Sequence, residues 1–165
     1  MILGIDPGSR YCGYGLIQME GRKVVAAGCD VINVAGLPSM PERLAGLYAK
    51  ISEVLAEYHP DVAAVESMFF HKQIKSVFTL GHARGVLLLA LAQHEVPLLE
   101  YSPREVKKSV VGTGNATKQQ VRYMIHQMYN LQHKDQRDDA YDALAIATCH
   151  YNRIKWLPDT NGVKP

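Results

Sequence analysis

The order of its predicted segments limits the fold of this chain more than any other feature of the sequence. Residues 1–6, 13–19 and 23–34 have the apolar content of strands, and the compact connection at 20–22 predicts a hairpin between the last two. Helical spacing then alternates with two more short strands, which gives the order βββαβαβααα. Three antiparallel strands followed by βα units indicate an α/β fold, with a mixed five-stranded sheet flanked by helices.

Short local signals support this order. Residues 62–65 (Val-Ala-Ala-Val) form a continuous apolar run of the kind that parallel sheets bury on both faces. A capping box of Ser39 and Glu42 predicts the start of one helix, and a second box of Ser102 and Glu105 predicts the start of another. Both kinds of element are therefore specified by their own residues.

Composition and length exclude several classes of protein. The 165 residues, 47% of them hydrophobic, suit one globular domain, which we place at 1–155 with a polar tail at 156–165. The longest apolar run, at 86–92, is far shorter than the roughly 20 residues that cross a bilayer, so no membrane span is expected. With no export signal at its start and three widely separated cysteines, the chain is predicted to be cytoplasmic.

Basic side chains are concentrated in the middle of the chain. Residues 67–137 carry 10 basic and 4 acidic side chains, whereas residues 1–66 carry 5 and 8, and residues 138–165 carry 3 and 4. The net charges are therefore +6, −3 and −1. A positive segment beside clustered carboxylates suits a polyanion brought to a metal ion, with a solvated basic face as the alternative.

Four acids stand where a sheet of this kind forms ligand sites. Asp6 and Glu66 each end a predicted strand, and their carboxylates meet if the two strands are parallel neighbours. Asp139 and Asp142 are three residues apart and share one face of the last predicted helix. Taken singly, these acids have ordinary structural explanations as turn, strand-end and helix-capping residues.

Taken together, the same acids indicate metal chemistry. Several carboxylates packed together repel one another unless cations compensate their charge. Ligands that are all oxygens indicate Mg²⁺ or Mn²⁺ rather than zinc. A two-metal phosphodiester hydrolase uses this arrangement.

A set of short motifs occurs in order along the chain: Gly4-Ile5-Asp6-Pro7-Gly8-Ser9-Arg10, Gly13-Tyr14-Gly15, Glu66, Ala83-Arg84-Gly85-Val86, Val110-Val111-Gly112-Thr113-Gly114 with Lys118, and residues 139–145. These ordered motifs resemble those of the RuvC family of Holliday junction resolvases, from residue 2 to about 150. The resemblance implies an RNase H-like fold, a homodimer, and Mg²⁺-dependent paired nicking of four-way DNA junctions in recombination and repair. It also implies two metal ions per site (Mg²⁺, replaceable by Mn²⁺), products with 5′-phosphate and 3′-hydroxyl ends, and a RuvAB branch-migration complex as partner.

The resemblance also assigns roles to individual residues. The catalytic, metal-holding acids fall on Asp6, Glu66, Asp139 and Asp142, and the neighbouring Asp138 offers an alternative ligand.

The DNA-binding positions fall on Phe69, Lys107, Lys118 and Arg84. The two lysines are otherwise solvated helix residues, and Phe69 is otherwise a core residue. The chain departs from the family pattern at Cys12, where threonine is common, and at Tyr141, which replaces a small residue.

Other functions account for parts of the sequence. Residues 4–8 also resemble the phosphate loop of actin-like kinases and ATPases, but those proteins need a second lobe for which 165 residues leave no room. A nuclease acting on RNA or simple duplexes and a non-catalytic junction-binding protein are the remaining alternatives. The helix predicted at 72–94 is apolar around much of its circumference, and part of that surface is a candidate for the dimer contact.

Overall fold

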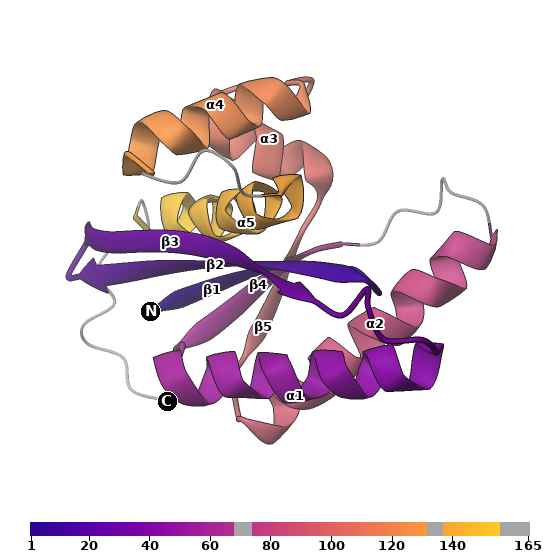
Figure 1. Ribbon diagram of the computed structural model, residues 1–165. Helices are drawn as coiled ribbons and strands as arrows, with labels where there is room; N and C mark the ends of the chain where they lie inside the picture. Colours follow the sequence, from indigo (N-terminus) through magenta and orange to yellow (C-terminus); the bar gives the residue numbers. More distant parts are fainter. Residues whose placement is uncertain (68–73, 132–136, 156–165) are drawn as a thin grey trace.

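The structure is a computed structural model that describes residues 1–67, 74–131 and 137–155, with residues 74–76 as backbone only. A central sheet separates two layers of helices (Figure 1). The predicted order βββαβαβααα is confirmed. The strands are β1 (Ile2–Asp6), β2 (Tyr11–Glu20), β3 (Lys23–Asn33), β4 (Val62–Glu66) and β5 (Leu98–Tyr101). The helices are α1 (Met40–Tyr58), α2 (Ile74–Gln93), α3 (Pro103–Val111), α4 (Lys118–Tyr129) and α5 (Asp138–Lys155).

The sheet is mixed, as predicted, with the strand order β3-β2-β1-β4-β5. Strand β2 runs antiparallel to both β1 and β3, and β4 runs parallel to both β1 and β5. In the parallel register Ile5 lies opposite Val65, so Asp6 and Glu66 are the next residues at the same edge of the sheet. The topology therefore brings together two acids that are 60 positions apart in the chain.

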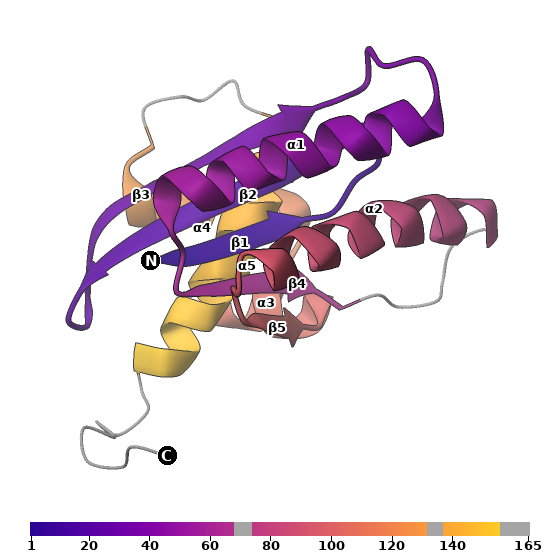
Figure 2. The same ribbon diagram turned by 90° about the horizontal axis from the view of Figure 1, so that it is seen from below.

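The two faces of the sheet carry separate cores. Helices α1 and α2 pack side by side on one face, as the view in Figure 2 shows. The core on that face is built around fully buried side chains such as Leu3, Leu47 and Leu87. The other face is covered by α5, with α3 and α4 packed outside it. That second core includes Ile17 and Leu144.

Helix α5 lies in direct contact with the sheet because β1 and β2 present glycines to it. A Cβ atom on Gly4 would lie 2.0 Å from the carbonyl oxygen of Ala143, and one on Gly13 would lie 1.9 Å from that of Asp139. Any larger residue at either position would push the helix off the sheet. The glycines therefore fix the distance between the end of β1 and the first turns of α5.

Local sequence signals explain where the helices begin. Both predicted capping boxes form, at Ser39 for α1 and at Ser102 for α3, and Thr117 caps α4 in the same way. The loop after α3 begins at Gly112, whose φ of 92° is a conformation that glycine adopts without strain. Within the parts of the chain that the structure describes, no helix combines the length and apolar character of a membrane span. Phe69 and the tail at 156–165 lie outside the described residues.

Candidate active site

Four acids from three elements converge at one edge of the sheet. Asp6 and Glu66 end the adjacent strands β1 and β4, and both are partly buried. Asp139 and Asp142 stand in the first turns of α5, which the glycine contacts hold against β1 and β2. The structure thus brings all four acids predicted from the sequence into one region.

The electrostatics of Asp6 reflect this crowding. The pKa of Asp6 is raised to about 7, and burial is the largest cause. The negative charges of Asp142, Asp139 and Glu66 contribute to the rise, whereas Lys118 opposes it. An ordinary aspartate has a pKa near 3.8. Asp6 therefore holds a proton more tightly than an isolated carboxyl does, because it is buried and because three like charges lie within electrostatic reach.

Two basic side chains pair with Asp139 and Asp142, the two acids that α5 contributes to the cluster. The Nζ atom of Lys118, at the start of α4, lies 2.8 Å from Oδ2 of Asp142, and Nε of Arg137 lies 3.0 Å from Oδ2 of Asp139. The guanidinium of Arg137 also stacks over the ring of Tyr11, 3.6 Å from its centroid. Each cation offsets part of the charge that the acid cluster concentrates.

The donor chemistry of the cluster fits a hard divalent cation. The four acids offer carboxylate oxygens only, and their mutual repulsion, which adds to burial in raising the pKa of Asp6, is what a bound cation would relieve. As the side chains stand, no three histidine, cysteine or acidic groups among the described residues are arranged to hold a metal ion. Asp139 and Asp142 instead each direct one oxygen to a basic partner. A cation at this site would compete with Lys118 and Arg137 for these oxygens.

Asp138, the alternative ligand, is placed differently from Asp139. Its side chain is 66% exposed and pairs at 2.7 Å with Arg122, one helical turn after Lys118. Arg122 also lies over the ring of Tyr141, at 4.5 Å from the centroid. Tyr141 itself is fully buried, so its bulk is accommodated under α4. The geometry favours Asp139 over Asp138 as the third acid of the cluster.

The predicted DNA-binding residues are not all placed alike. Lys118 is 75% exposed beside the acids, and Lys107 is partly buried on α3. Arg84 is turned inward, with only 9% of the residue exposed. It donates to the backbone carbonyl of Glu66 and pairs with Glu100. This placement argues against the predicted contact between Arg84 and DNA.

Three residues near the acids, Arg122, Arg137 and Glu100, are not among those predicted from the sequence. The sequence does contain a signal for Arg122, because this residue follows Lys118 by four positions and so shares its helix face. Arg137 directly precedes the acidic run of α5, which was a second signal. Glu100 had none, since its partner becomes apparent only when α2 packs on the sheet.

A mixed five-stranded sheet with acids at the carboxyl edge of β1 and β4 and at the start of α5 defines a nuclease of the RNase H-like class. The family model described as Crossover junction endodeoxyribonuclease RuvC matches residues 2–150. The chain belongs to this RuvC family, as its motifs predicted.

Relatives and solved structures agree with this assignment. The RuvC of Proteus mirabilis is 46% identical over 155 residues, which cover 93% of this chain and 88% of that protein. The RuvC of Vibrio cholerae is 45% identical over 157 residues, covering 95% and 90%. The structure of Thermus thermophilus RuvC in complex with a Holliday junction substrate matches with a TM-score of 0.84 and 30% identity, over 93% of this chain and 94% of that one. A yeast mitochondrial Holliday junction resolvase shares the fold at 16% identity and a TM-score of 0.62, over 92% of this chain and 77% of that one.

Proposed function

We propose that this protein resolves four-way DNA junctions by metal-dependent paired nicking, in the cytoplasm and in the service of recombination and repair. The observation that carries the proposal is the convergence of four carboxylates on one sheet edge, in a chain of the RuvC family. The solved Thermus thermophilus relative was captured with a Holliday junction substrate, which supports the choice of substrate.

Asp6, Glu66, Asp139 and Asp142 would hold two Mg²⁺ ions, with Mn²⁺ as a substitute. When bound, the cations would supply Lewis-acid chemistry, acidifying a water molecule and stabilising the leaving 3′ oxygen, which would give 5′-phosphate and 3′-hydroxyl ends. The carboxyl of Asp6 must release its proton before it can act as a ligand, since its pKa is raised to about 7.

The basic residues around the acids have two tasks in this proposal. Without cations, Lys118 and Arg137 neutralise Asp142 and Asp139 through the ion pairs described above. With the acids holding cations, these two side chains would be free to face the DNA phosphates. Lys118, which is 75% exposed, is best placed to offset charge that develops on the scissile phosphate. Lys107 on α3 extends the positive surface along the DNA backbone.

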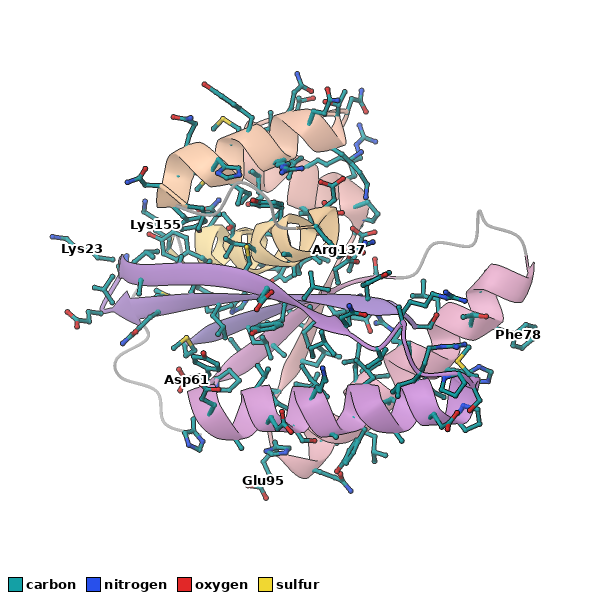
Figure 3. All side chains as sticks on the ribbon, viewed as in Figure 1. Lys23, Asp61, Phe78, Glu95, Arg137 and Lys155 are labelled. Atoms are coloured by element: carbon teal, nitrogen blue, oxygen red, sulfur yellow. The ribbon has the colours of Figure 1, made fainter. Side chains whose placement is uncertain are left out.

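The outer face of α2 is the proposed homodimer contact. Phe78 is 65% exposed and Leu89 is 53% exposed, and Figure 3 shows Phe78 pointing away from the body of the protein. Gly81 and Gly85 lie between them at helical spacing, and a Cβ atom on either would meet nothing within 4 Å. Two copies of such a face can pack helix against helix at close range.

A symmetric dimer carries two cutting sites. It matches the near-twofold symmetry of a four-way junction, so each subunit can cut one of two strands of like polarity. We also propose that a branch-migration complex of the RuvAB type delivers the junction, because the residues of this chain match those of the RuvC family.

A cleavage assay on a denaturing gel tests the proposal. Wild-type protein with Mg²⁺ should produce symmetric nicks in a synthetic four-way junction, and chelation should abolish them. Asp6→Asn should bind the junction without cutting it, because it removes one of the converging carboxylates. If RNA or simple duplexes were cut as well as the junction, the protein would be a nuclease that is not selective for junctions. Junction binding without any Mg²⁺-dependent nick would favour a non-catalytic binding protein.

A further inference from the structure

A buried arginine joins α2 to the strand end that carries Glu66. Arg84 donates one guanidinium N–H (Nη1) to the backbone carbonyl oxygen of Glu66 at 2.9 Å. Its second terminal nitrogen (Nη2) pairs with Oε1 of Glu100 at 2.5 Å. The neighbouring Ala83 and Leu87 are fully buried in the core between α2 and the sheet, and so fix which face of α2 points inward.

The two acceptors of Arg84 lie on adjacent parallel strands at the same edge of the sheet. Glu66 is the last residue of β4 and pairs with Tyr101 of β5, while Glu100 pairs with Val65 one step earlier. The backbone N–H of Ser67 still donates to the carbonyl of Tyr101, at 2.8 Å. The guanidinium therefore fixes the peptide group at the point where β4 leaves the sheet.

We propose that Arg84 is a positioning residue for cleavage: it holds the end of β4 so that the carboxylate of Glu66 faces Asp6, and it does not bind DNA. This inference rests on the proposed function, in which Glu66 is one of the metal-holding acids. The direction of the Glu66 side chain follows from its backbone, and the backbone is held by Arg84 on one side and by β1 and β5 on the others.

The chemistry of the contact requires arginine. The planar guanidinium offers two N–H groups in a fixed fork, so it can satisfy a carbonyl oxygen and a carboxylate at once. The ammonium group of lysine is a single compact charge and cannot span both acceptors in the same way. A DNA phosphate would have to displace Glu100 from a guanidinium whose side chain is only 11% exposed.

The variant Arg84→Lys tests this role. We expect kcat on a four-way junction to fall about tenfold or more with KM nearly unchanged, because small displacements of a reacting group are costly. The Mg²⁺ concentration at half-maximal rate should rise, and so should the Mg²⁺ concentration needed to raise the melting temperature. Junction affinity in Mg²⁺-free buffer, and its salt dependence, should stay at wild-type values. Arg22→Lys, at the opposite end of the sheet, is the matched control and should match wild type throughout.

Glu100→Gln distinguishes positioning from DNA contact. If Arg84 is held in place by Glu100, this variant should lower kcat in the same direction as Arg84→Lys. The double variant should then lose less than the product of the two single losses, since both act through one contact. If Arg84 instead binds phosphate, removing the competing carboxylate of Glu100 should strengthen junction binding.

Two results would overturn the inference. A loss of junction affinity in Arg84→Lys would identify a DNA contact that needs the two-pronged guanidinium, since lysine keeps the charge but not the fork. A lower melting temperature with unchanged kcat and unchanged Mg²⁺ midpoints would identify a purely structural residue. Failure of the proposed function appears separately, as wild-type protein that does not cut junctions at all.

Discussion

On one face of the sheet α5 touches the strands backbone to backbone, whereas on the other face α2 reaches the strand end through an arginine side chain. Gly4 and Gly13 leave no atom between β1, β2 and α5, so Asp139 and Asp142 are placed by main-chain contact. Glu66 is placed by the side chain of Arg84. One acid cluster thus depends on a rigid contact on one side and on an adjustable contact on the other.

Gly13→Ala should have the largest effect, because it breaks the rigid contact. Its new methyl group would lie 1.9 Å from the carbonyl oxygen of Asp139, so α5 must shift. We expect a loss of about 3 kcal/mol or more in the free energy of unfolding, and a loss of cleavage of about a hundredfold or more. Urea denaturation and the junction assay measure the two effects.

Gly28→Ala on β3 is the matched control, since a Cβ atom there meets nothing within 4 Å. It should leave both quantities close to wild type. Wild-type activity in Gly13→Ala would mean that the glycine contact does not place the acids.

Asp6→Asn should stabilise the metal-free protein at alkaline pH, where the wild-type carboxylate is charged although it is buried beside three other acids. The pKa of Asp6 is about 7 in the folded protein and near 3.8 in an ordinary carboxyl. The folded state therefore binds the proton more tightly, and stability falls as pH rises from about 4 to 7. In chelator, Asp6→Asn should gain about 2 to 4 kcal/mol over wild type at pH 8 and little at pH 4.

Urea denaturation at the two pH values measures this gain. Glu53→Gln, an exposed change on α1, serves as the control and should show no such difference. A gain of equal size at both pH values would contradict the electrostatic explanation.

Leu89→Asp tests the outer face of α2 without touching its inner face. Leu89 is already 53% exposed, so the free energy of unfolding of the subunit should change by less than about 0.5 kcal/mol. Sedimentation should show a shift from dimer to monomer, and paired nicking should be lost. Val25→Asp, which changes a residue 48% exposed on β3, should remain dimeric. A dimeric Leu89→Asp would place the contact elsewhere.

The smallest effect on stability should come from the titration of His150, which connects α5 to β5. Its Nδ1 lies 2.7 Å from the hydroxyl of Tyr101, the β5 residue paired with Glu66. Burial lowers the pKa of His150 below the ordinary 6.5, and the charge of Arg153 lowers it further. The unfolded chain therefore binds this proton more readily, so the contribution to stability is complete above about pH 6.5 and is lost as pH falls.

The variant His150→Gln removes the titrating group and serves as the reference. The free energy of unfolding of wild type, relative to this variant, should decline by at most about 1.4 kcal/mol per pH unit below pH 6.5. Urea denaturation between pH 7.5 and 5.5 measures the decline. An identical pH dependence in the two proteins would show that His150 does not titrate in this way.

The sequence predicted the elements and the acid cluster because both depend on local signals. Capping boxes and apolar periodicity define the helices and strands, and Asp6 and Glu66 could be paired because each ends a strand. The inward turn of Arg84 could not be predicted in the same way. It depends on which face of α2 meets the sheet and on a partner, Glu100, that lies in another strand.

The two faces of α2 connect the proposed dimer contact to the position of Glu66. Helix α2 presents Phe78 and Leu89 outward and Arg84 inward. In the proposed dimer, α2 would therefore lie between the neighbouring subunit and Glu66, and a single subunit would lack that support for the helix. Efficient cleavage would then require two subunits to meet on the same branched substrate.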